Sequence, residues 1–214
     1  VVAFTDQRPD TYGQFDTSSI ATSATRTFNL EGNPTSVFSR PSLDATASGF
    51  IVTLADKTLL SSHKYDLKFT GALSDSSYMS FGGFHDQRKF SMNDLKSGLM
   101  NGLTFSNSYI SDSNVLTEFE YEYAKYNAKA SYETYQSNSF GINVTSMLGS
   151  KWGFKFALSH ANKSHFAPLP IFGERKEEIN SAKIEFSQTS YDNCIFASYR
   201  VAKKSQEVNF NHNT

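Results

Sequence analysis

Hydrophobic and polar residues alternate along most of the chain from Gly49 onward. The alternation comes in segments of roughly ten residues, separated by clusters of Gly, Ser, Asn and Asp. A period of two is the side-chain period of a β-strand, and its regular return predicts strands joined in an antiparallel meander. We count about eleven such strands, the last of them a separate strand in EVNFNHN from Glu207, and expect an all-β fold.

The stretch EFEYEYAKYNAKASYETYQ, residues 118–136, has the sharpest alternation. Its acidic side chains are Glu118, Glu120 and Glu122, and the aromatic side chains between them are Phe119, Tyr121 and Tyr123. In a strand the three carboxylates share one face over about 13 Å. Like charges at that spacing repel unless water or cations lie between them, so we expect a wet acidic face. Lys125 follows the aromatic run and marks where the apolar zone is expected to stop.

Two other segments divide polar from apolar side chains in the same way. In KYDLKFTGAL the apolar set is Tyr65, Leu67 and Phe69, and the polar set is Lys64, Asp66 and Lys68. In KWGFKFALSH the apolar set is Trp152, Phe154, Phe156 and Leu158, and the polar set is Lys151 and Lys155. Each strand is therefore expected to separate water from an apolar environment. That environment is lipid in a membrane barrel and the core in a soluble sheet.

Residues 1–48 are rich in Ser, Thr, Asp and Pro and show weak periodicity. We interpret them as a linker or leader with one or two strands, ahead of a β-barrel domain at residues 49–214. No helix of ordinary length is expected, because the best candidate, FSMNDLKSGLM, is short. We count five strands between the two long connections, HDQRKFSMNDLKS and ANKSHFAPLPIFGERKEEIN, which predicts that they lie at opposite ends. A simple barrel would keep its long loops on one side.

Composition and charge exclude several classes of protein. The chain has 20 basic and 21 acidic residues, and neither kind forms a long block, so no nucleic-acid partner is expected. Charged residues make up 19% of the chain and aromatic residues 14%, a balance typical of exported β-proteins and outer-membrane barrels. No run approaches the roughly 18 apolar residues of a transmembrane helix. The single Cys194 excludes an internal disulfide.

Few residues are candidates for catalysis or metal binding. The histidines are His63, His85, His160, His165 and His212. His160 and His165 are close in sequence but have no acid at metal-ligand spacing, so we expect ordinary surface or interfacial histidines and no cofactor. A hydrolase at a barrel rim would have two candidate groups, His85–Asp86 and Asp112 with Ser111 or Ser113. Such residues are common at strand ends and no G-x-S-x-G motif is present, so no enzyme activity is expected.

Four segments succeed one another from about Gly98: SYISDSNVLTEFEYEYA, FGINVTSMLGSKWGFKFALSH, LPIFGER and CIFASYRVAKKS. In composition and order they resemble the C-terminal translocator barrels of bacterial autotransporters with subtilisin-like passengers. The resemblance implies twelve antiparallel strands in the Gram-negative outer membrane, a linker held in the pore, and export of the polypeptide that precedes the barrel. Because the chain ends in NFNHNT, we expect a fragment whose missing strand lies past Thr214.

A further segment, GERKEEINSAKIEFSQTS, is similar to the barrels of surface-lipoprotein assembly modifiers. This second resemblance implies a different cargo but the same physical role, that of an outer-membrane barrel. We expect an outer-membrane β-barrel that forms a translocation pore, with membrane lipid and a linked passenger polypeptide as partners. The alternative is a secreted or cell-surface β-sandwich or lipocalin-like barrel that binds a ligand or host surface. The residues expected to line the lumen are Glu118, Glu120, Glu122, Lys151 and Lys155. Those expected to face lipid or its interface are Phe119, Tyr121, Tyr123, Trp152, Phe154 and Phe156.

Overall fold

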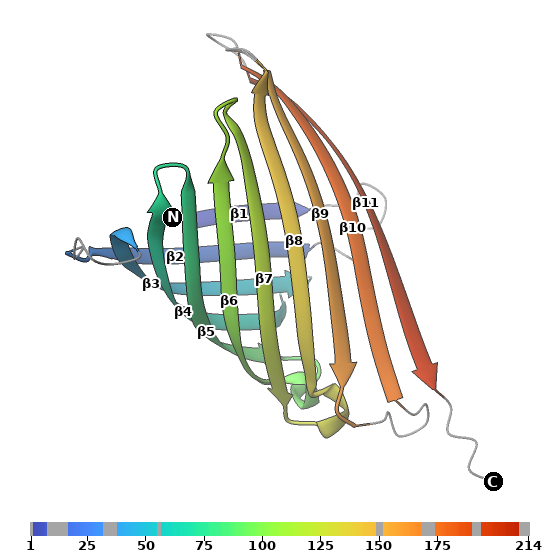
Figure 1. Ribbon diagram of the computed structural model, residues 1–214. Helices are drawn as coiled ribbons and strands as arrows, with labels where there is room; N and C mark the ends of the chain where they lie inside the picture. Colours follow the sequence, from blue (N-terminus) through green and yellow to red (C-terminus); the bar gives the residue numbers. More distant parts are fainter. Residues whose placement is uncertain are drawn as a thin grey trace.

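The computed structural model describes residues 2–7, 17–31, 38–54, 57–148, 152–167, 174–189 and 194–209. They form one sheet of eleven antiparallel strands, in which each strand pairs with its neighbours in the sequence (Figure 1). The all-β antiparallel meander predicted from the alternating pattern is confirmed. No pairing joins β1 to β11 within these ranges, so the sheet is open.

The strands differ in length, and the longest are β4, with 18 residues, and β3, β10 and β11, with 16 residues each. They are β1 (Val2–Gln7), β2 (Thr17–Asn29), β3 (Ser39–Leu54), β4 (Lys57–Ser74), β5 (Ser77–Phe90), β6 (Gly98–Ile110), β7 (Val115–Ala128), β8 (Tyr135–Leu148), β9 (Trp152–His165), β10 (Glu174–Thr189) and β11 (Cys194–Asn209). Two single 3-10 turns, η1 (Asp94–Lys96) and η2 (Ser131–Glu133), are the helical elements of the described ranges. Neither is long and apolar enough to cross a membrane.

The number of strands agrees with the count from sequence, but the strands are not all the same ones. β1, β2 and the first part of β3 come from residues 1–48, and the expected boundary after residue 48 falls inside β3. The sequence also predicts a separate strand from Glu207, whereas β11 runs without a break to Asn209. The sequence count also holds one strand too many between the two long connections, so two surplus strands offset β1 and β2 in the total.

Successive connections alternate between the two ends of the sheet. One end, here called the loop end, carries η1 at residues 91–97 and η2 at residues 129–134. The other, the turn end, carries the short connections 75–76 and 111–114. At the turn end Asn114 has a φ of 58°, a left-handed conformation that asparagine tolerates well.

The prediction that the two long connections lie at opposite ends is wrong. Four strands, β6 to β9, separate them, and both connections lie at the loop end. The error came from counting one strand too many between them. From β4 to β10 the connections of the loop end are longer than those of the turn end, as in an up-and-down barrel. Nearer the N-terminus the order is reversed, with a short connection between β3 and β4 at the loop end and a longer one between β2 and β3 at the turn end.

The sheet is strongly twisted and curled. In Figure 1, β1 to β3 cross behind the middle strands, β6 to β8, at a steep angle. The ladder is regular, and its register shifts at only three places in the described ranges, between Ser39 and Ser42, Val52 and Thr53, and Ala72 and Ser74. A continuous ladder of this kind fixes which side chains share a face from one strand to the next.

Candidate functional site

The pairing registers divide the side chains between two faces. One row of directly paired residues runs Ser80, Ser106, Glu120, Gly141 and Ser159 across β5 to β9. The next row runs Phe81, Phe105, Tyr121, Phe140 and His160 on the opposite face. We call the face with Glu118, Glu120 and Glu122 the polar face, and the face with Phe119, Tyr121 and Tyr123 the apolar face.

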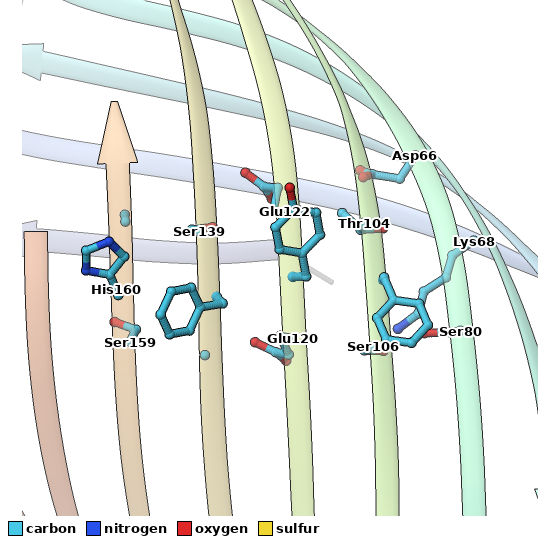
Figure 2. A pocket seen from close by; sticks show the side chains of 15 residues that line it. Asp66, Lys68, Ser80, Thr104, Ser106, Glu120, Glu122, Ser139, Ser159 and His160 are labelled. Carbon is cyan, nitrogen blue, oxygen red and sulfur yellow. Dashed lines mark hydrogen bonds between the residues drawn. The ribbon is translucent and has the colours of Figure 1, made fainter. Parts of the chain in front are cut away.

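The polar face is hollowed into a groove of about 470 Å³. Figure 2 shows Glu120 and Glu122 on β7 between hydroxyl side chains of the neighbouring strands. The residues of the polar face that line the groove with polar side chains are Asp66, Lys68, Ser80, Thr104, Ser106, Glu120, Glu122, Ser139 and Ser159, from six adjacent strands. Tyr121 and His160, which lie on the opposite face, also line it. A hollow that touches six neighbouring strands on one side requires that side to be concave.

The three carboxylates of β7 lie among small or hydroxyl-bearing partners. Their paired residues are Thr104, Ser106 and Ser108 on β6, and Ser139, Gly141 and Asn143 on β8. In the described ranges none of the three carboxylates forms an ion pair. Lys68 lines the same groove, but it forms no ion pair with them in the described ranges. We therefore expect water and mobile ions to balance most of their charge.

Of the two lysines expected on the same side as the glutamates, one can be placed. Lys155 lies on the polar face, where it pairs with Thr145 on β8 and Glu185 on β10. Glu185 also binds the ammonium group of Lys183 at 2.7 Å. Lys151 lies outside the described residues.

The apolar face exposes large hydrophobic side chains over almost its whole width. Leu103 is 64% exposed and Tyr199 is 69% exposed. The exposed set on this face comprises Ile20, Phe28, Ile51, Tyr65, Leu67, Phe81, Leu99, Leu103, Tyr109, Phe119, Tyr121, Phe140, Ile142, Trp152, Leu158, Ile184, Phe186, Tyr199 and Val201. Water-soluble monomers rarely expose a continuous apolar patch of more than a few hundred Å².

A line of polar residues bounds this apolar zone on the side of the loop end. We call it the polar rim, and it consists of His63, His85, Asn101, Lys125, Asn138, His160, Asn180 and Lys203, one from each of β4 to β11. Hydrogen bonds join several rim residues across strands. Nδ1 of His85 lies 2.8 Å from Oδ1 of Asn101, and Nδ1 of His160 lies 2.7 Å from Oδ1 of Asn180.

The polar rim crosses the ladder diagonally. Its residues on β5 to β7 pair directly with one another, and so do those on β9 to β11. The first set includes Lys125, whereas the second set is aligned with Tyr121, four residues nearer the turn end of β7. The rim thus slips by about one residue per strand. The rise is about 3.3 Å per residue, and neighbouring strands lie about 4.8 Å apart. If all rim residues lie at the same height along a barrel axis, this slip corresponds to strands tilted by about 35° from that axis.

At the loop end the polar face carries a packed apolar core instead of a hydrated groove. Its buried members are Phe84, Met100, Ala124 and Tyr126, with Ala128 and Tyr135 packed against them. Gly102 makes room for the ring of Phe84, since a Cβ there would overlap the ring. The hydroxyl of Tyr126 donates a hydrogen bond to the carbonyl of Lys96, which fixes η1 to the sheet.

Charged side chains surround this core and compensate one another. The Nη2 of Arg175 lies 2.8 Å from Nε2 of His165 and 3.4 Å from Oε2 of Glu133. Glu177 faces Nε of Arg175 at 3.3 Å and the ammonium group of Lys204 at 2.9 Å. These contacts join η2 to β9, β10 and β11. We call the core and these charged residues together the loop-end cluster.

A second ion pair ties the two connections of the loop end together. The ammonium group of Lys129 lies 2.5 Å from Oδ2 of Asp94. Its hydrogen bond lowers the pKa of the Asp94 carboxyl below the usual value. The pair is exposed, so its contribution to stability is small.

The histidines and acids considered for catalysis are not brought together. His160 and His165 lie on opposite faces of β9, and so do His85 and Asp86 on β5. Asp86 is buried, and it accepts hydrogen bonds from Ser62 and Arg88. His212 lies outside the described residues. Within the described ranges, no three His, Cys, Asp or Glu side chains are grouped so that they could hold a metal ion.

The fold and its faces define a class of protein: an open antiparallel β-meander with a concave polar face and an exposed apolar face. No protein-family model matches the chain, and no curated protein sequence matches it either. The two faces, the polar rim and the loop-end cluster are the features from which a function can be inferred.

Proposed function

We propose that the chain forms the wall of an outer-membrane β-barrel whose polar face lines a water-filled translocation pore. The observation that carries this proposal is the broad zone of exposed hydrophobic side chains, bounded by the polar rim. Lipid is the environment that covers such a zone on all strands at once.

The width of the zone argues against a secreted sandwich or lipocalin-like barrel. Fully burying one large hydrophobic side chain stabilises a water-soluble fold by about 1.5–3 kcal/mol. A soluble sheet would therefore turn Leu103, Phe140 and Tyr199 inward, yet these side chains are 64%, 48% and 69% exposed. The face that turns inward instead carries glutamate, serine and threonine.

The slope of the polar rim supports the same proposal independently of hydrophobicity. Strands of transmembrane barrels are tilted by about 35–45° from the barrel axis. A belt of side chains at constant depth in the bilayer must then cross the ladder diagonally, by about one residue per strand. The rim follows this slope from β4 to β11.

The polar face fits the role of a pore wall. Its central residues are mostly small, such as Ser106, Ser139, Gly141 and Ser159, and so leave room for water and an extended chain. The resemblance to autotransporter barrels supports a linked passenger polypeptide as the cargo. In lipid, the free edges of β1 and β11 must also pair with further strand, because unpaired backbone groups are costly there.

Labelling of single cysteines in proteoliposomes tests the proposal, starting from a Cys194→Ser background. Glu120→Cys should react with a charged, membrane-impermeant maleimide, because its side chain lies on the hydrated face. Its neighbour, Tyr121→Cys, should resist this reagent and react with a lipid-soluble maleimide. Equal reaction of the two sites with the charged reagent would overturn the proposal.

A gel assay and a solubility measurement complete the test. A closed membrane barrel stays folded in SDS until it is boiled, so the unboiled protein should migrate differently from the boiled protein. It should also require detergent to remain monodisperse. A monodisperse, detergent-free protein without this gel shift would favour the soluble alternative.

A further inference from the structure

A second hollow, of about 560 Å³, lies mainly on the apolar face across β8 to β11. Its walls are Ile142 and Leu158 on one side and Val201 on the other, and these residues pair in one row with Ala182. Because the side chain of Ala182 is small, a trough forms over β10 between larger neighbours. We call this hollow the β8–β11 groove.

One end of the β8–β11 groove is polar. There, Phe140, His160, Asn180 and Lys203 form the neighbouring row of paired residues, the last three belonging to the polar rim. The ring of Phe140 packs on that of His160, with centroids 5.1 Å apart. Nδ1 of His160 donates to Oδ1 of Asn180 at 2.7 Å, which leaves the amide NH₂ of Asn180 as a donor.

Lys203 is the cation of this polar end. Its side chain is exposed, and no described carboxylate forms an ion pair with it. The next residue, Lys204, points to the polar face and binds Glu177. Glu178 shares the apolar face with Lys203, but it pairs with Ser205, one step farther toward the loop end. The groove therefore offers an uncompensated positive charge directly beside an apolar trough.

We propose that the β8–β11 groove holds one anionic phospholipid. The phosphate lies against Lys203 and the amide of Asn180, and an acyl chain lies over Ala182 between Leu158 and Val201. The groove matches such a lipid in both charge and polarity, since it changes from cationic to apolar along its length. The inference rests on the proposed function, because a lipid reaches this face only if the face is embedded in a bilayer.

Another hollow of the sheet is a suitable control for the β8–β11 groove. A smaller hollow of about 370 Å³ lies on β2 to β4, and Ile20, Ala47, Ile51, His63 and Tyr65 are among its lining residues. It too has an alanine among larger apolar side chains. None of its lining residues is a lysine or arginine, so it should not select an anionic lipid.

The experiment counts lipids bound to the full chain in detergent by native mass spectrometry, with phosphatidylglycerol or phosphatidylcholine added. Ala182→Leu should remove one bound phosphatidylglycerol, whereas the matched variant Ala47→Leu should not. Lys203→Gln should weaken phosphatidylglycerol binding about fivefold, the effect of one lysine near an anionic headgroup. It should leave phosphatidylcholine binding unchanged.

Equal lipid counts for Ala182→Leu and Ala47→Leu, or an unchanged lipid preference in Lys203→Gln, would overturn the inference. Val201→Phe closes the groove from the opposite wall and replaces Ala182→Leu if that variant does not fold. Flotation of the unaltered protein with liposomes separates the two proposals. Failure to insert overturns both, whereas insertion without selective lipid binding overturns only the lipid site.

Discussion

The middle of the polar face and its loop end have the same strand periodicity, but the middle is an open groove with charged side chains and the loop end is a packed apolar core. In the middle, Glu120 lies between Ser106 and Gly141 and forms no ion pair with any residue that the structure describes. At the loop end, Phe84 and Tyr126 are buried, and the carboxylate of Glu177 is paired with Lys204. One face of a sheet can thus be open to water in one region and packed as a core in another, depending on the size and charge of its side chains.

The largest contrast is expected from truncating phenylalanines. Phe84→Ala should lower the free energy of unfolding by about 3–5 kcal/mol, because its ring is buried in the loop-end cluster. Phe140→Ala should cost clearly less, because that ring is 48% exposed in the folded sheet. Denaturant titration in detergent measures both. Equal losses would show that the loop end is no more tightly packed than the rest of the sheet.

Breaking the charge network should have the next largest effect. Glu177→Gln should cost about 1–3 kcal/mol, since it removes the carboxylate that faces both Arg175 and Lys204 and leaves Glu133 as the remaining carboxylate beside Arg175. Combining Glu177→Gln with Arg175→Met should recover part of this loss. A double-mutant cycle from thermal or denaturant unfolding gives the coupling, and strictly additive losses would contradict the pairing.

Two glycines of the polar face offer a matched pair. Gly102→Ala should cost about 1–3 kcal/mol, because the new methyl group overlaps the ring of Phe84 and forces it to move. In Gly141→Ala the nearest atom, the carbonyl oxygen of Leu158, lies 3.6 Å away, so that variant should be almost neutral. Unfolding midpoints of the two variants can be compared directly. A neutral Gly102→Ala would show that the ring of Phe84 is free to shift.

The smallest effect is expected in the hydrated groove. Glu120→Gln should change the free energy of unfolding by no more than about 0.5 kcal/mol, because the carboxylate is solvated and unpaired. The difference in free energy of unfolding between Glu120→Gln and the unaltered protein should be smaller at high salt than at low salt, since salt screens the repulsion among the three glutamates. A loss of several kcal/mol would mean that the carboxylate has a structural partner.

The strands and their faces were predictable because alternation is a local signal. Glu120 and Tyr121 must point to opposite faces once residues 118–123 form a strand, and Lys155 and Phe156 follow the same rule. The placement of Trp152, Phe154 and Phe156 on the apolar face beside Phe119, Tyr121 and Tyr123 depends on registers that continue from β7 to β9.

The loop-end cluster was not predictable, because it depends on contacts between distant parts of the chain. Arg175 and Glu133 lie 42 residues apart, and Phe84 finds its space only where Gly102 pairs with it. One signal was present in the sequence: Tyr126 is an aromatic residue in phase with the glutamates. The strand at residues 17–29 was hard to assign because Ser and Thr alternate there with residues of similar polarity.

The diagonal course of the polar rim has a consequence for the height of the wall. β9, β10 and β11 continue beyond His160, Asn180 and Lys203 for five residues or more toward the loop end. In the proposed barrel this length corresponds to about 15 Å of sheet standing clear of the hydrocarbon layer. β6 and β7 end closer to the rim, at Gly98 and Ala128. β4 and β5 also continue beyond His63 and His85 for five residues or more. In the proposed barrel two groups of strands, β4–β5 and β9–β11, would therefore stand above the hydrocarbon layer, where proteases, antibodies and soluble partners can reach them.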